Sequence, residues 1–147
     1  GGGTYSKLFK VVREEMSLCY YCSARLISQK GIIFVQSGID TENEEKTKNA
    51  IIAQLEDIKA GNFRDEDLQS SIDSLVNRFG TISDTPEDLD DWFSLQIVTD
   101  EMKKPSEYAE NIRKVTREDV IAAARRVTLD TVFMLKSSES GEEKTDA

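Results

Sequence analysis

The feature that most constrains the fold is a pair of strand-forming segments joined by a short turn. Residues 19–28, CYYCSARLIS, and residues 32–39, IIFVQSGI, are rich in residues that favour strands. Gln29-Lys30-Gly31 lies between them and has the composition of a turn. Two such segments with so short a connection predict an antiparallel hairpin. One face of that hairpin needs a covering layer from the rest of the chain.

The remaining segments have helical periodicity and recognisable ends. Ser6 is placed to cap the first helix, and Thr41 with Glu44 has the T-x-x-E spacing of a capping box. Gly61 is a typical residue after a helix end, and Pro86 suits a first helical turn. The spacing predicts helices over 6–16, 41–60, 65–79, 86–97, 105–114 and 116–127, and a final strand over 131–136.

This order of elements predicts an α+β fold, with a mainly antiparallel sheet and helices packed on one of its faces. We expect one domain over residues 1–136. Residues 137–147 are polar and acidic, and we expect them to form a disordered tail.

The chain contains no histidine, which restricts its chemistry more than any motif does. It lacks the commonest general base, the usual partner of a serine or cysteine nucleophile, and the imidazole ligands of catalytic zinc. Its formal net charge of -9 opposes binding to nucleic acid or to an anionic membrane surface. No apolar run approaches the ~20 residues that span a bilayer. With only two cysteines, we expect a reducing, cytoplasmic setting.

Cys19 and Cys22 have the C-x-x-C spacing of redox and zinc sites. Their neighbours favour a strand, in which residues three apart point to opposite faces. A zinc site would also need two more ligands, and the chain has no other cysteine and no histidine. We therefore interpret both cysteines as small buried apolar residues, and we predict no metal or cofactor site in this chain.

Residues 2–40 resemble the second, zinc-free domain of the insulinase/pitrilysin family of zinc peptidases, the inverzincins, and are closest to its bacterial members. In that family a glycine-rich stretch precedes a helix of the form S-x-L-F-x-x-V-R-E, which is followed by a strand that starts with L-x-Y and then a glycine-led strand. The matching residues are Gly2-Gly3, Ser6, Leu8-Phe9, Val12-Arg13-Glu14, Leu18, Tyr20 and Gly31. Later segments agree in order, so the resemblance extends over about residues 2–136.

The resemblance implies a substrate-binding domain that completes a catalytic site housed elsewhere. In this family the catalytic domain binds zinc through H-x-x-E-H and a distal glutamate, and this chain lacks that motif. The zinc-free domain supplies an arginine and a tyrosine seven positions apart, which Arg13 and Tyr20 match. By resemblance, Tyr20 would donate to the substrate carbonyl or developing oxyanion, and Arg13 would contact a backbone carbonyl or carboxylate.

Strand alternation leaves the choice of tyrosine open. It places Tyr20 on the same face as Cys22, Ala24 and Leu26, which is the more apolar face. Tyr21 lies on the wetter face and is the alternative candidate. A bulge at the start of the strand would allow Tyr20 to reach the wetter side.

Two functional hypotheses follow, which differ in whether the parent protein is a peptidase. In the first, this chain binds peptide substrate beside a catalytic domain or subunit that holds zinc. In the second, it belongs to a non-catalytic interaction subunit that has lost peptidase activity. We also expect the domain to lack the first strands of the family fold, which would expose a sheet edge and allow a homodimer.

Overall fold

The computed structural model describes residues 2–82, 85–97 and 102–136. Its first element, η1, spans Leu8–Glu15 and is a π-helix. In a π-helix each N–H donates to the carbonyl five residues earlier. The bond from the Met16 N–H to the Val11 carbonyl, at 2.9 Å, has this spacing. The Ser6 hydroxyl accepts from the Phe9 N–H at 3.3 Å, but the N-cap position of η1 is Lys7, which has no side-chain cap.

The hairpin forms as predicted. Strand β1 spans Tyr21–Ile27 and pairs antiparallel with β2, Ile32–Gly38. A short 3-10 turn, η2, spans Ser28–Lys30 and ends at Gly31, whose φ of 63° is the left-handed conformation that glycine adopts most easily.

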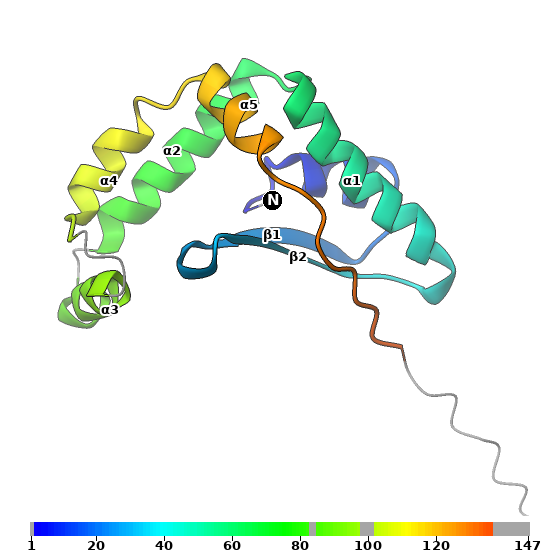
Figure 1. Cartoon of the computed structure of the whole chain (residues 1–147), viewed down its shortest axis with the longest axis horizontal. Coiled ribbons are helices and arrows are strands. Elements are labelled where there is room, and N and C mark those ends of the chain that lie inside the picture. The colour runs from blue at the N-terminus through cyan, green and yellow to red at the C-terminus, as the bar shows by residue number, and fades with distance from the viewer. Residues whose placement is uncertain (1, 83–84, 98–101, 137–147) are drawn as a thin grey trace, which may run out of the picture.

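Helices α1 (Glu44–Ala60) and α5 (Arg117–Arg125) lie on one side of this two-stranded sheet, and the other α-helices extend beyond its end (Figure 1). Helix α1 packs against α5, and α2 packs against α4. This arrangement confirms the predicted α+β class with helices on one face. None of the helices in the described ranges is long and apolar enough to cross a membrane. The helical elements are η3 (Thr41–Asn43), α1 (Glu44–Ala60), α2 (Asp65–Thr81), α3 (Pro86–Gln96), α4 (Pro105–Ile112) and α5 (Arg117–Arg125).

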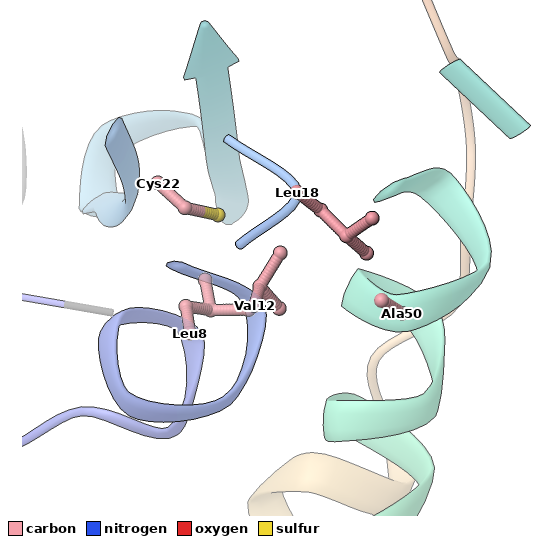
Figure 2. Close-up of a cluster of buried hydrophobic side chains, with 5 residues drawn as sticks. All are labelled: Leu8, Val12, Leu18, Cys22 and Ala50. Carbon is pink, nitrogen blue, oxygen red and sulfur yellow. The ribbon is translucent and has the colours of Figure 1, made fainter. Parts of the chain in front are cut away.

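The apolar core lies where η1, the start of β1 and α1 meet (Figure 2). Val12 is at its centre and is fully buried, with 0% of its surface exposed. The Leu18 N–H donates to the Val12 carbonyl at 3.1 Å, which fixes the chain between η1 and β1. The buried members are Leu8, Val12, Leu18, Cys22 and Ala50.

Helix ends agree with the sequence in some places and not in others. Thr116 and Asp119 form a capping box at α5, and the Thr85 hydroxyl accepts from the Asp88 N–H at 3.1 Å at the start of α3. The box predicted for Thr41 and Glu44 does not form. A 3-10 turn occupies Thr41–Asn43, and neither that turn nor α1 has a side-chain cap.

The strand predicted over residues 131–136 is absent. This segment has no regular secondary structure, and Phe133 and Leu135 are 82% and 84% exposed. Strand propensity forms a strand only where a neighbouring strand supplies hydrogen bonds, and no described strand pairs with this segment. Lys136 instead pairs with Glu44 at the start of α1, at 2.6 Å. The predicted tail, 137–147, lies outside the described residues.

Gly61 should be the most sensitive glycine of the helical layer. Its φ is 81°, its N–H donates to the Ile58 carbonyl, and a β-carbon there would approach Ile121 Cδ1 to 3.1 Å. We predict that Gly61→Ala lowers the free energy of unfolding by about 1–2 kcal/mol, because a side chain disfavours the left-handed conformation. Urea denaturation followed by circular dichroism measures this difference.

Gly80→Ala is the matched control. Gly80 lies within α2, has no positive φ, and has open space where its β-carbon would be. Gly80→Ala should therefore raise the free energy of unfolding by about 0.5–1 kcal/mol. Equal destabilisation by both substitutions would contradict this account of Gly61.

Candidate functional site

The two residues predicted to act together, Arg13 and Tyr20, line the same surface hollow. Arg13 lies on η1 and Tyr20 lies directly before β1, and the chain between them turns through Ser17, whose φ is 50°. The hollow has a volume of about 330 Å³. Its lining residues are Arg13, Ser17, Leu18, Cys19, Tyr20 and Asp40.

Arg13 follows the buried Val12 and is itself exposed. Its guanidinium lies over the Phe9 ring, 4.6 Å from the ring centroid, a cation–π contact within one face of η1. No carboxylate in the described ranges forms an ion pair with it. The contact with Phe9 orients the guanidinium, and its N–H donors remain available to a ligand.

Two lysine side chains connect η1 and the residue before it to α1 and α2 by ion pairs. Lys7 Nζ lies 3.2 Å from an Asp57 carboxylate oxygen and donates to the Asn62 carbonyl at 2.9 Å. Lys10 Nζ lies 2.7 Å from Asp67 Oδ1 at the start of α2. These contacts hold the element that carries Arg13 in a fixed place.

Asp67 should make this attachment sensitive to acid. Hydrogen bonds from Arg64 and then from Lys10 hold the pKa of the Asp67 carboxyl well below its usual range. Because the folded-state pKa is the lower one, the stabilisation is complete above the unfolded pKa, near 4, and is lost as the pH falls below it. We predict that Asp67→Asn lowers the free energy of unfolding by about 1 kcal/mol at pH 7.

Urea denaturation at pH 7 and at stepwise lower pH tests this dependence. The difference between Asp67→Asn and the parent chain should shrink as the pH falls below about 4. Asp90→Asn on α3, which removes an exposed carboxylate, is the control and should have little effect at either pH. A difference for Asp67→Asn that does not change with pH would contradict the assigned cause.

Tyr20 lies directly before β1, and Tyr21 is the first residue of the strand. Gly38 is the register partner of Tyr21, and its carbonyl also accepts from the Tyr20 N–H at 2.8 Å. The one-to-one pairing of the two strands begins at Tyr21, so Tyr20 lies outside β1 and strand alternation does not fix the side to which it points. Tyr20 is 68% exposed, so it does not lie on the buried side that simple alternation predicted.

Tyr21, the alternative candidate, is outside the hollow. Its ring lies against Gly38, where an added β-carbon would come within 2.4 Å of Tyr21 Cε1. Gly38 therefore makes room for the Tyr21 ring, and Tyr20 is the tyrosine that lines the hollow with Arg13.

Asp40 is a part of the hollow that sequence reasoning missed. The Tyr20 hydroxyl donates to Asp40 Oδ1 at 2.8 Å. That hydrogen bond, and then the negative charge of the carboxylate, raise the pKa of the Tyr20 phenol above its ordinary value. Asp40 lies two residues after the end of β2, and only the pairing of the two strands brings it to Tyr20.

The start of β1 at Tyr21 also corrects the prediction for the cysteines. Cys19 precedes β1, so the strand alternation that was to separate the two side chains does not apply to it. Both cysteines are free and pack in the core, Cys22 buried and Cys19 partly buried. Burial, and next the neighbouring Cys19, raise the pKa of the Cys22 thiol to about 11. Cys22 therefore stays protonated and unreactive near neutral pH, as expected for a packing residue.

The residues of this chain do not fit the zinc ion that the family resemblance places in a catalytic domain. The sequence has no histidine. Within residues 2–82, 85–97 and 102–136, no group of three or more aspartate, glutamate or cysteine side chains is placed to hold a metal ion.

A second hollow of about 410 Å³ lies between α2 and α3. The Trp92 ring beside it meets the Phe79 and Tyr108 rings edge-on, at centroid distances of 5.6 Å and 5.0 Å. None of the predicted site residues lines it. Its lining residues are Arg78, Phe79, Thr81, Ile82, Asp88, Asp91, Trp92 and Leu95.

Residues 1–75 match the family described as "Peptidase M16 inactive domain". The chain belongs to this family. It is 34% identical over 139 residues to the "Probable inactive metalloprotease YmfF" of Bacillus subtilis (strain 168). That alignment covers 95% of this chain and 33% of the relative, so the chain spans about a third of the relative's length. The match confirms the bacterial peptidase-family resemblance seen in the sequence.

Solved structures agree with this assignment. A conserved protein from Enterococcus faecalis V583 superposes with a TM-score of 0.78 at 29% identity, over 86% of this chain and 30% of that one. A protease from Helicobacter pylori gives a TM-score of 0.72 at 16% identity, over 84% and 30%. The second likeness shows the shared fold alone.

Proposed function

We propose that this M16 inactive domain is a peptide-binding domain of a larger protein and has no catalytic centre of its own. The observation that carries the proposal is the convergence of Arg13 and Tyr20 on one hollow. The two come from different elements, and both are exposed to an arriving ligand.

The chemistry of the hollow suits a peptide backbone. Arg13 offers several N–H donors in a planar fork, which fits a carbonyl or carboxylate oxygen. Tyr20 and Asp40 offer oxygen acceptors for peptide N–H groups. A volume of about 330 Å³ is at the lower end of the range for ligand pockets, which suits a short stretch of chain.

The surrounding protein would decide whether binding leads to hydrolysis. A catalytic domain or subunit with H-x-x-E-H would supply the zinc, and Tyr20 would then assist by donating to the oxyanion. In this structure the Tyr20 proton is bonded to Asp40, so that assisting role requires the bond to break. The two free cysteines support a reducing, cytoplasmic setting.

The second candidate is an interaction subunit without peptidase activity. It is favoured by the 34% identical relative, whose name is "Probable inactive metalloprotease". Peptide binding by this domain is compatible with both candidates. The sequence of the complete protein separates them, because only a peptidase needs the H-x-x-E-H motif.

Peptide binding by the purified chain tests the shared part of both candidates. We predict that a short unstructured peptide with a C-terminal fluorophore binds and raises the fluorescence anisotropy. Arg13→Gln should weaken binding by about tenfold, because it removes a charge-assisted hydrogen bond.

Arg126→Gln is the control for the loss of charge, since Arg126 is exposed at the end of α5, outside the hollow. Peptide binding that Arg13→Gln and Arg126→Gln weaken equally would show that the hollow is not the binding site.

A further inference from the structure

The side chain of Asp40 does not cap the helical turn that follows it. It occupies the N-cap position of η3, with extended backbone angles, and its main-chain carbonyl accepts from the Asn43 N–H at 2.9 Å. An aspartate at such a position usually accepts a second hydrogen bond through its side chain. Here no side-chain cap forms, and the carboxylate accepts the Tyr20 hydroxyl at 2.8 Å instead.

This bond fixes the polarity of one side of the hollow. A phenol has a single proton, and the proton of Tyr20 is directed at Asp40. What remains towards the hollow is a set of acceptors, namely the phenol lone pairs and the second oxygen of an ionised carboxylate. Within the described part of the chain, no cation forms an ion pair with Asp40. A ligand on this side must therefore bring N–H or O–H donors.

Arg13 gives the hollow a positive charge, in addition to the negative charge of Asp40. Its guanidinium is held over Phe9, and it forms no ion pair with Asp40 although both line the same hollow. An acceptor on the ligand is drawn to Arg13, and a donor is drawn to Asp40. A peptide carries both, and its most strongly donating group is a primary ammonium, which has three N–H bonds and a positive charge.

We infer that Asp40 holds the phenol of Tyr20 in place and selects a primary ammonium group of the bound peptide, either a free amino terminus or a lysine side chain. The inference rests on the proposed peptide binding and adds a specificity to it. An ammonium placed there can donate to Asp40 and to the Tyr20 oxygen together. The net charge of -9 draws a cationic ligand towards the whole chain.

Four versions of one peptide separate the possible sources of the ammonium group. Each carries a C-terminal fluorophore and one lysine; the versions have both amines free, an acetylated amino terminus, an acetylated lysine, or both amines acetylated. We expect the doubly acetylated peptide to bind about tenfold more weakly than the free one. The singly acetylated version that binds as weakly as the doubly acetylated one identifies the recognised amine.

Asp40→Asn keeps the shape of the side chain and removes its charge. It should weaken binding of the free peptide by about tenfold and leave the doubly acetylated peptide unchanged. Glu42→Gln is the matched control, because it removes the same charge from an exposed residue nearby that does not line the hollow. Its effect should stay below about twofold, as expected for a screened charge.

The claim that Asp40 holds the Tyr20 phenol in place is tested by a separate measurement. Asp40→Asn should move the pKa of the Tyr20 phenol down towards its ordinary value, measured by ultraviolet titration with Tyr20→Phe as the blank. A phenol pKa that does not change would show that Asp40 does not hold Tyr20 in solution.

The outcomes separate this inference from the proposed function. If Arg13→Gln weakens binding and Asp40→Asn acts no more strongly than Glu42→Gln, the inference is wrong and peptide binding stands. If all four peptides bind equally well, selection of an ammonium group is wrong. If none of them binds, the proposed function is wrong, and the inference is wrong with it.

Discussion

The packing of η1 against the start of β1 and against α1 is the interaction on which the rest depends. Val12 is fully buried at their junction, and its carbonyl accepts from the Leu18 N–H, so the helix, the turn and the strand are joined through one residue. Because Val12 points inward, its neighbour Arg13 is exposed at the surface beside Tyr20. Loss of this cluster would separate the two sides of the hollow, since they belong to different elements.

The entry of the chain into β1 determines which tyrosine belongs to the hollow. Tyr20 precedes the strand and is exposed, whereas the Tyr21 ring lies against Gly38. The exposed phenol meets Asp40, which strand pairing brings from the end of β2. The hollow thus contains an arginine, a phenol and a carboxylate, a set suited to binding a peptide by hydrogen bonds and charge. Its acceptor-rich side is poorly suited to a developing oxyanion while Asp40 holds the phenol proton.

The sequence was sufficient for the hairpin and the helical layer. Arg13 and Tyr20 came from the family resemblance, and their role stays a prediction. Alternation and capping residues are local signals, so β1, β2 and most helix ends followed from them. The strand over 131–136 failed because a strand needs a neighbour, and propensity does not supply one. The separation of Cys19 from Cys22 failed because the strand begins at Tyr21, so Cys19 lies outside its alternation. Asp40 was missed because its partner is twenty residues away and is set by strand register.

The most direct test of the central claim is to map bound peptide on the chain by NMR. In a titration of the isotope-labelled chain with the unlabelled peptide, the backbone amide signals of Arg13, of residues 17–20 and of residues 38–40 should shift most. These residues form or adjoin the hollow. If the largest shifts instead occur at Phe79, Trp92 and Leu95, around the second hollow, and residues 17–20 do not respond, the account is contradicted.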